Sequence, residues 1–324
     1  MKKNKLNLVS VIVVLLMIMV IIYSGFQILK STVLHHEVIE EEKAPSKTIV
    51  KDGVAYFPKQ DMTTILLMGI DNEGAMVSSG SYLNDGETDV NYVLMFDEAE
   101  ETFQVLSLNR DTMVSMPVLG LGGKCAGTQV AQLALSHTYG DGMESSCENT
   151  RETVSKLLKG TVIDYYIAFN MDAIDILTDA VGGVTVNVTD DFYLADPSLG
   201  MGEVKLTGEQ AVSFIRLRKD VGDQMNISRM KRQEEFIHGF LTALHEKMEN
   251  GDSFIGHTYE KLSDYMVTDC SINVVSNLLE KYSGYELKEI VTPKGTNTNG
   301  EHMEFYLDEE SFDHLVIDMF YREK

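Results

Sequence analysis

The stretch DYYIAFNMDAIDILTDAVGGVTVNV, residues 164–188, decides the fold class. Its first six residues are typical of a strand, and residues 170–181 then follow a helical pattern, with Asn170 available to cap the first turn. Gly182 and Gly183 end that helix, and VTVNV alternates apolar and polar residues as a second strand does. Because strand and helix alternate, the sequence predicts a mixed α/β domain.

The segments that precede this stretch add further strands. TTILLMGID (63–71) is a nearly continuous apolar run, as in a buried strand, and VNYVLMF (90–96) and TFQVLSL (102–108) flank the acidic turn DEAEE, which predicts a hairpin. We expect GLGGKCAGTQ (120–129) to be a flexible loop. The segments VAQLALSHTYG (130–140) and CENTRETVSKLLKG (147–160) have the pattern of helices.

The segments that follow it are mostly helical. LTGEQAVSFI (206–215) begins with Thr207 and Gln210 in the spacing of a capping box, and a longer helix is expected from about 228 to 248. Residues 250–324 add two helical patterns, the strand-like run MEFYL (303–307) and a final amphipathic helix. No internal repeat or second domain is evident, so residues 63–324 are interpreted as one domain with its core motifs in 63–240.

The N-terminus has the features of a membrane anchor. Residues 1–5 carry three lysines, residues 6–29 contain no charged side chain, and an acidic stretch follows. A run of this length can cross a bilayer as a helix, and the charge asymmetry places the N-terminus in the cytoplasm and the bulk of the chain outside. We therefore expect a single-pass protein of the cell membrane, with a linker over residues 30–62.

The net charge and the cysteines exclude several classes of function. The chain has a formal charge of −23, which disfavours binding to nucleic acid because such binding depends on neutralising phosphates with a basic surface. Cys125, Cys147 and Cys270 lack the spacing of a zinc site. Outside the membrane, Cys125 and Cys147 could form a disulfide, and three free thiols are the alternative.

Basic side chains gather in SFIRLRKDVGDQMNISRMKRQ, residues 213–233, which holds four of the seven arginines. In extended chain Arg216 and Arg218 would point the same way, and Arg229, Arg232 and Gln233 share a helical face near a helix N-terminus. Arginine forks and a helix N-terminus suit phosphate oxygens. Salt bridges to the many acidic residues are the alternative.

An apolar stripe continues that helical face through Phe236, Phe240 and Leu244. A basic head followed by an apolar stripe would suit a ligand with a phosphate head and a lipid tail. The alternative is that the stripe is part of the protein core, which is the commoner use of such a pattern.

Acidic residues stand at the ends of the early strands. Asp71 follows the first strand, Asp89 precedes the second, and Arg110 and Asp111 follow the third. If these strand ends share one rim, two carboxylates could hold a divalent cation, and oxygen ligands with substrate phosphates favour Mg²⁺ or Mn²⁺. Turn aspartates without a ligand are the alternative.

Seven of these segments, in this order behind one N-terminal anchor, resemble the LytR-CpsA-Psr family of bacterial envelope proteins. They are ILLMGID, TDVNYVLMF, VLSLNRDT, AQLALSHTYGDG, IDYYIAFNMDAIDILTDAVGGVTVNV, LTGEQAVSFIRLR and SRMKRQ. The resemblance implies a central, mostly antiparallel sheet flanked by helices. It also implies a phosphotransferase that moves an anionic glycopolymer from a polyprenyl pyrophosphate carrier to peptidoglycan.

The resemblance also implies roles for individual residues. Asp71 and Asp89 correspond to metal ligands. Arg110, Arg216, Arg218, Arg229 and Gln233 correspond to pyrophosphate-binding residues, supported by Asp111 and Arg232. Among these, Asp89, Arg110, Asp111 and Arg218 are the expected catalytic residues, and Phe236, Phe240 and Leu244 are expected to line a lipid pocket.

The chain departs from the family pattern at three places. Glu87 stands where the family usually has arginine, Gln132 where it often has lysine, and Asp223 lies six residues before Arg229, with Asn226 at the expected position of the acid. Two readings therefore stay open: a transferase, for which hydrolysis with water as acceptor is a variant, and a membrane-anchored protein that binds the lipid-linked polymer without turnover.

Overall fold

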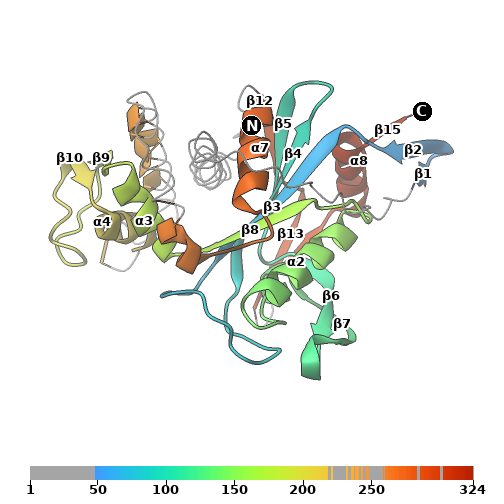
Figure 1. The fold of residues 1–324 in the computed structure, drawn as a ribbon, viewed down its shortest axis with the longest axis horizontal. Helices are drawn as coiled ribbons and strands as arrows, with labels where there is room; N and C mark the ends of the chain where they lie inside the picture. Colours follow the sequence, from blue (N-terminus) through green and yellow to red (C-terminus); the bar gives the residue numbers. More distant parts are fainter. Residues whose placement is uncertain are drawn as a thin grey trace. The chain divides into compact units, whose positions relative to one another are not determined.

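The computed structural model describes residues 48–217, 220–221, 258, 260–282, 285–299 and 302–323, with several positions between 231 and 247. These residues form two compact units (Figure 1). We call residues 34–169, 267–271 and 281–324 the sheet unit, and residues 170–266 and 272–280 the hairpin unit. The sequence pattern predicted one domain, because it contains no recognisable linker between the two units.

A six-stranded sheet forms the centre of the sheet unit, with strand order β11-β8-β3-β4-β5-β12. Antiparallel pairing joins β3 to β4 and β4 to β5, and β12 pairs with β5 in parallel. The sheet is therefore mixed and mostly antiparallel, as expected. Its strands are β3 (Met62–Ile70), β4 (Thr88–Asp97), β5 (Thr102–Leu108), β8 (Tyr165–Asn170), β11 (Met266–Thr268) and β12 (Glu286–Val291).

Both faces of this sheet are buried, which explains the nearly continuous apolar runs of its strands. On one face, side chains such as Leu66 and Met95 belong to a core that includes residues of helices α2 (Glu144–Leu157) and α8 (Glu309–Phe320). On the other face, Ile65 and Leu94 are also fully buried, and Phe96 stacks on Tyr282 with 4.4 Å between the ring centroids.

In the sequence between β5 and α2, most residues form a hairpin of β6 (Met113–Leu119) and β7 (Cys125–Gln132). The expected loop at 120–129 therefore lies partly in a strand, after a short 3-10 turn at Leu121–Gly123. The helix expected at 130–140 is wrong: β7 runs to Gln132, and only the 3-10 turn Leu133–Ser136 follows. Pairing with β6 overrides the helical pattern there, because strand pairing depends on residues distant in sequence.

The two ends of the described chain meet in a small sheet. Strands β1 (Ile49–Lys51) and β2 (Val54–Pro58) pair with each other, and β2 also pairs with β15 (Tyr321–Glu323). The expected linker over 30–62 is thus wrong in its second half. The run MEFYL is confirmed as strand β14 (Met303–Leu307), paired with β13 (Gly295–Asn299). One of the expected C-terminal helical patterns is α7 (Ile272–Tyr282), and the expected final helix is α8.

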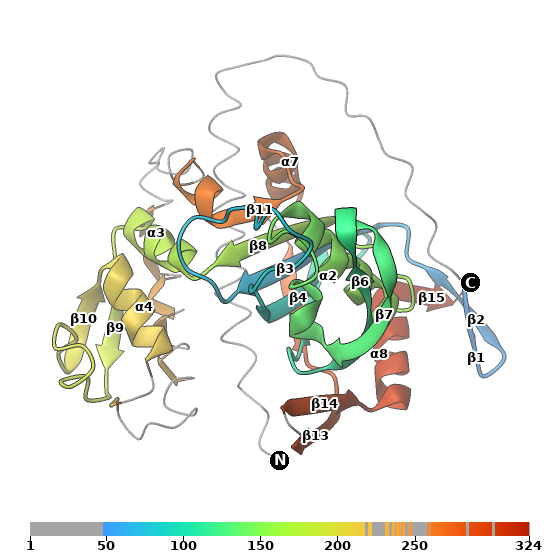
Figure 2. The same cartoon turned by 90° about the horizontal axis from the view of Figure 1, so that it is seen from below.

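The hairpin unit contains most of the stretch that decides the fold class. Helix α3 (Asp172–Ala180) and strand β9 (Val184–Val188) follow β8 as predicted, and the Asn170 side chain accepts a hydrogen bond from Ala173 N at 3.3 Å. Strand β9 does not join the six-stranded sheet; it pairs with β10 (Gly202–Leu206) (Figure 2).

Helix α4 (Gly208–Arg216) lies beside α3 in the same unit (Figure 2). The predicted capping box at its start is confirmed, because Thr207 and Gln210 exchange both hydrogen bonds. Gly208 allows the close approach of the two helices, because a Cβ at this position would clash with the Asp175 side chain.

The expected anchor, residues 6–29, lies outside the described residues. Among those that are described, no helix combines the length and the apolar character that crossing a membrane requires.

Candidate functional site

One edge of the six-stranded sheet collects the acidic residues that the sequence singled out. Strand β3 ends at Ile70, opposite Thr88 at the start of β4. Just beyond this pair, Asp71 N donates a hydrogen bond to the Glu87 carbonyl at 3.0 Å. Strand β5 ends beside them, and Arg110 and Asp111 follow it. We call Asp71, Glu87, Asp89, Arg110 and Asp111 the rim.

The Arg110 guanidinium is surrounded by three carboxylates of the rim. Its Nη2 donates to Glu87 at 2.5 Å, Nη1 pairs with Asp89, and Nε lies 3.6 Å from Asp111. About a third of the Arg110 side chain is exposed (34%), and Asp89 is exposed to 44%. One cation thus serves three formal negative charges at a solvent-accessible place, so this edge of the sheet can accept a further cation.

The turn that carries Arg110 and Asp111 is held on several sides. Asp111 N donates to the Asn109 side chain at 2.9 Å, and the carbonyls of Arg110 and Asp111 accept hydrogen bonds from Ala134 N (3.0 Å) and Phe305 N (2.8 Å). The main chain of both residues is therefore fixed by strand β14 and by the turn after β7. A positioned main chain limits where these two charged side chains can reach.

Gln132 of strand β7 contacts the rim directly. Its amide nitrogen donates to Asp111 Oδ1 at 3.0 Å and to the Met303 carbonyl at 2.6 Å. The side chain therefore connects strand β7, the Asp111 carboxylate and strand β14 without adding charge. The sequence marked this position only as a departure and did not predict the contact.

A buried histidine fastens the loop that leads into the rim. His137 Nδ1 lies 2.8 Å from the Gly86 carbonyl, and the neighbouring Asn84 amide donates to the carbonyl of His137 at 2.8 Å. Burial lowers the pKa of His137 to about 4, because a charged imidazole would lose its hydration there. The ring is neutral near pH 7, and it holds the main chain one residue before Glu87.

The predicted metal ligands, Asp71 and Asp89, lie on the rim. Two amide oxygens near them in sequence, Asn72 Oδ1 and Asn91 Oδ1, are buried and accept no hydrogen bond. Within the described part of the chain, no three His, Cys, Asp or Glu side chains form a metal cluster. Two carboxylates, spare amide oxygens and substrate phosphates are a donor set that fits Mg²⁺, which rarely uses an all-protein cage.

The predicted arginine segment belongs to the hairpin unit, and the structure describes part of it. Arg216 is exposed and is the last residue of α4, so the expectation that it lies in extended chain is wrong: the helix continues to it from the capping box. Leu217 is the first extended residue. Arg218, Arg229 and Gln233 lie outside the described residues.

Arg232 is buried, with 3% of its side chain exposed. Its Nε donates to the Phe214 carbonyl at 2.8 Å, Nη2 donates to the Leu217 carbonyl, and Nη1 pairs with Asp190 at 2.5 Å. Its guanidinium also lies over the Phe192 ring. Arg232 therefore secures the end of α4 from inside the unit, which fits the supporting role and leaves it no exposed face for direct contact with a phosphate.

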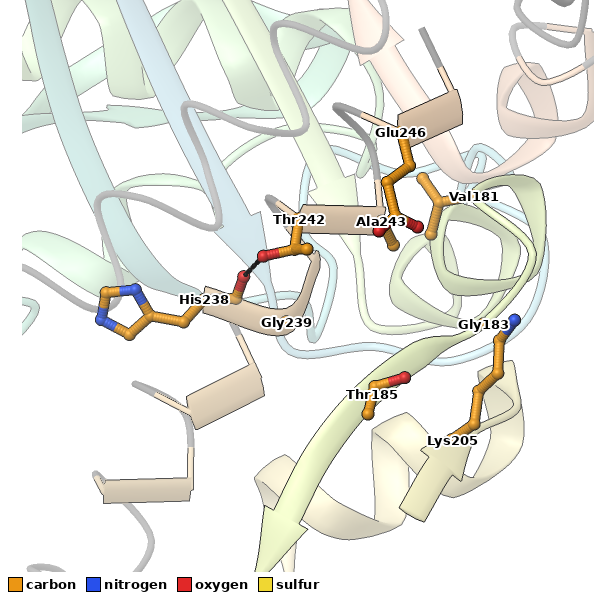
Figure 3. Close-up of a pocket in the computed structure, with 9 residues that line it drawn as sticks. All are labelled: Val181, Gly183, Thr185, Lys205, His238, Gly239, Thr242, Ala243 and Glu246. Atoms are coloured by element: carbon orange, nitrogen blue, oxygen red, sulfur yellow. Dashed lines mark hydrogen bonds between the residues drawn. The ribbon is translucent and has the colours of Figure 1, made fainter. Parts of the chain in front are cut away.

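Two of the three predicted lipid-pocket residues pack against each other in the hairpin unit. Phe236 and Phe240 are buried, with 6.0 Å between their ring centroids; Leu244 lies outside the described residues. A cavity of about 410 Å³ lies beside the same segment, but these two phenylalanines do not line it (Figure 3). Its lining consists of Val181, Gly183, Thr185, Lys205, His238, Gly239, Thr242, Ala243 and Glu246.

The three cysteines are free. Cys125 is exposed near the end of the β6–β7 hairpin, whereas Cys147 is fully buried in α2, where its sulfur lies 3.9 Å from His137 Nε2. The possible disulfide between Cys125 and Cys147 is therefore not present in this structure. The physical reason is that one thiol faces solvent on a hairpin and the other packs in the core.

Comparison with known proteins gives relatives over most of the chain. The teichoic acid transferase TagU of Bacillus subtilis (strain 168), named a polyisoprenyl-teichoic acid–peptidoglycan teichoic acid transferase, is 25% identical over 280 residues, which cover 85% of this chain and 80% of TagU. The crystal structure of B. subtilis TagV is 25% identical, with a TM-score of 0.56 over 81% of this chain and 96% of TagV.

A third relative is known with a ligand. The structure of TagT bound to LI-WTA is 20% identical and shares the fold, with a TM-score of 0.56 over 88% of this chain and 98% of TagT. The family model of the LytR_cpsA_psr family matches residues 22–316, which include the hairpin unit, most of the sheet unit and the rim. The chain belongs to the LytR_cpsA_psr family.

Proposed function

We propose that this protein is a phosphotransferase that moves an anionic glycopolymer from a polyprenyl pyrophosphate carrier to peptidoglycan. Relatives at about 25% identity are named as transferases of polyisoprenyl-linked teichoic acid to peptidoglycan, and the family match supports extending that activity class to this chain. The apolar run at residues 6–29 supports an anchor in the cell membrane, with the N-terminus in the cytoplasm and the rim outside.

The observation that carries the proposal is the placement of Arg110 among carboxylates at the edge of the sheet. Asp89 of β4 is brought together with Arg110 and Asp111 of the turn after β5, and all three are partly exposed. A guanidinium suits phosphate oxygens, and a carboxylate beside it can accept a proton from an attacking hydroxyl. This is a set of groups that phosphoryl transfer uses.

The reaction follows from these groups. A sugar hydroxyl of peptidoglycan attacks the phosphorus next to the polymer, its P–O bond forms, and the bond from that phosphorus to the bridging oxygen breaks, so that polyprenyl phosphate leaves. Asp111 is proposed to take the hydroxyl proton. Arg110 neutralises charge that develops on the phosphate oxygens, which lowers the barrier most where water is excluded.

Mg²⁺ or Mn²⁺ is the proposed cofactor. Asp71 and Asp89 would hold it, and the buried amide oxygens of Asn72 and Asn91 are further donors near them in the chain. When bound, the cation would supply positive charge to the pyrophosphate and so stabilise the polyprenyl phosphate that leaves. For Arg216, Arg218, Arg229 and Gln233, a role in binding the same phosphates stays a prediction from sequence, as does the lipid pocket around Phe236, Phe240 and Leu244.

A second candidate function is binding of the lipid-linked polymer without turnover. The observation that favours it is that Glu87 pairs with Arg110 and that neutral Gln132 contacts Asp111. Compared with the family pattern, these positions lack two cations and add one acid. A site with less positive charge could still bind the substrate, but it would give less stabilisation to the negative charge that develops in the transition state.

One assay separates the two candidates. The full chain in detergent is incubated with a polyprenyl pyrophosphate-linked sugar, Mg²⁺ and a peptidoglycan oligosaccharide, and the product is measured by mass spectrometry. A transferase forms the phosphodiester product, and Asp89→Asn reduces the rate by about 100-fold or more. Lipid binding without any product from the unsubstituted protein would instead establish the binding function.

A further inference from the structure

Glu87 is the member of the rim for which the proposed reaction has no use. Asp89 and Asp111 have proposed roles in metal binding and proton transfer, and Arg110 binds phosphate. Glu87 nevertheless accepts a hydrogen bond from this guanidinium, with 2.5 Å between Oε2 and Nη2. It therefore occupies donor atoms that a pyrophosphate would need.

The main chain around Glu87 is fixed, so the contact is built into the fold. The Glu87 carbonyl accepts from Asp71 N at 3.0 Å, Gly86 N donates to the Asn84 side chain at 2.7 Å, and the Gly86 carbonyl contacts His137 at 2.8 Å. The two residues on either side, Gly86 and Thr88, are buried. An ion pair on a mobile surface loop would be worth little, but here one partner is held beside the other before any ligand binds.

The Arg110 guanidinium has no nitrogen turned only to solvent. Nη2 meets Glu87, Nη1 meets Asp89 and Nε faces Asp111. A pyrophosphate that approaches this group alone brings further negative charge to three carboxylates, and it must displace at least one of them. A pyrophosphate that carries a divalent cation brings less negative charge, and the cation also attracts the carboxylates away from Arg110.

We propose that Glu87 is an intramolecular competitor for Arg110 that makes pyrophosphate binding depend on a divalent cation. In the ligand-free protein the Glu87 carboxylate is hydrogen-bonded to the Arg110 guanidinium. It therefore disfavours the binding of a pyrophosphate that carries no cation. The metal complex releases Arg110 and binds. Glu87 thereby selects the form of the carrier that is competent for transfer. This inference rests on the proposed function, since it assumes that the rim binds the pyrophosphate.

The test measures binding of geranyl pyrophosphate to the full chain in detergent by isothermal titration calorimetry, in Mg²⁺ and in EDTA. Glu87→Gln keeps the shape of the side chain and removes its charge. We expect it to raise the affinity about tenfold in EDTA, equivalent to about 1.4 kcal/mol, and to change the affinity less than about threefold in Mg²⁺, where the competitor is already displaced.

Asp85→Asn is the matched control. Asp85 is an exposed acid on the same loop, two residues earlier, and its neutralisation removes the same charge without touching Arg110. We expect its affinity in EDTA to stay within about twofold of the unsubstituted protein, because exposed charges are strongly screened. Thermal denaturation of both variants confirms that they are folded.

The results separate this inference from the proposed function. If the unsubstituted protein binds geranyl pyrophosphate in Mg²⁺ but Glu87→Gln gains nothing in EDTA, or gains no more than Asp85→Asn, then Glu87 is not a competitor and only the inference is overturned. If the unsubstituted protein binds no geranyl pyrophosphate in either condition, the proposed function fails and the inference fails with it.

Discussion

Arg110 in the sheet unit and Arg232 in the hairpin unit are the same residue type in opposite surroundings. Arg110 is 34% exposed and faces three carboxylates, whereas Arg232 is 3% exposed and faces one carboxylate and two main-chain carbonyls. Both came from motifs that the sequence associates with pyrophosphate binding. Exposure and the kind of partner, rather than the residue type, therefore separate an arginine that can bind a ligand from one that holds the fold together.

The partners explain the difference in physical terms. Main-chain carbonyls cannot move away without disrupting the end of α4, so the donors of Arg232 stay committed to the protein. Carboxylate side chains can rotate away from Arg110 or accept a cation in its place. Because the Arg110 pairs are partly exposed, they cost less to break than the buried pair of Arg232 and can be exchanged for a ligand.

Loss of the buried arginine should have the largest effect. Arg232→Ala leaves Asp190 and two carbonyls without their partner, and removing one member of a buried ion pair costs about 3–5 kcal/mol of the free energy of unfolding. Urea denaturation measures this loss. Arg322→Ala, at an exposed arginine of β15, is the control and should stay within about 0.5 kcal/mol. A loss below about 1 kcal/mol for Arg232→Ala would contradict the structural role.

Loss of the rim arginine should act on activity instead. Arg110→Ala should lower the transfer rate about 100- to 1,000-fold, since a donor to developing phosphate charge is removed, while the free energy of unfolding changes by less than about 1 kcal/mol. Arg110→Lys keeps the charge but loses the planar fork, so its transfer rate should lie between those of the unsubstituted protein and Arg110→Ala. Unchanged transfer in Arg110→Ala would place the reaction elsewhere.

The free energy of unfolding should fall in acid because of His137, the buried histidine that holds the loop of Glu87. The ordinary pKa of histidine is about 6.5 and burial lowers that of His137 to about 4, so protonation favours the unfolded chain. Its contribution to stability is fully present above pH 6.5 and is lost as the pH falls towards 4, about 3 kcal/mol in all. Denaturation at several pH values should show this loss in the unsubstituted protein.

His137→Gln is the comparison for that experiment, because it lacks the titrating ring but keeps every carboxylate that titrates in the same range. Its free energy of unfolding should be lower near pH 7 and should fall less steeply between pH 6.5 and 4. Parallel pH profiles of the two proteins would show that His137 does not control the acid sensitivity.

The smallest effect is expected at Gln132. Gln132→Ala removes the hydrogen bonds to Asp111 and to the Met303 carbonyl, and we expect a loss of about 1 kcal/mol in stability and a fall of a few fold in transfer. Gln129→Ala, on the same strand, removes a bond to the Tyr139 hydroxyl and should lower stability without a change in transfer. Equal transfer in the two variants would show that Gln132 does not position Asp111.

Local patterns predicted much of the fold. The strands at 62–70, 88–97 and 102–108, helix α3 with β9, and the capping box of α4 all agree with their sequence patterns. These elements depend on apolar periodicity and on capping residues, which are short-range properties. The helix expected at 130–140 failed because β6, more than ten residues earlier, pairs with the first part of that segment.

The candidate site was predicted in its residue types but not in its contacts. Asp71, Asp89, Arg110 and Asp111 could be named because strand ends at one edge of a sheet come together. The pairing of Glu87 with Arg110, the contact of Gln132 with Asp111, and the buried His137 behind the loop could not, since each joins positions more than 20 residues apart. No short-range pattern records such distances.

The opening stretch, residues 164–188, shows the same division. Its apolar periodicity and its glycines were sufficient for strand, helix and strand, because each depends on neighbours within a few residues. Its first strand joins the six-stranded sheet, whereas its second pairs with β10. These pairings depend on which distant backbone groups are available to form hydrogen bonds. Likewise, the chemistry of arginine makes it a potential phosphate ligand. The folded chain buries Arg232, which makes it a structural residue, and it leaves Arg110 partly exposed.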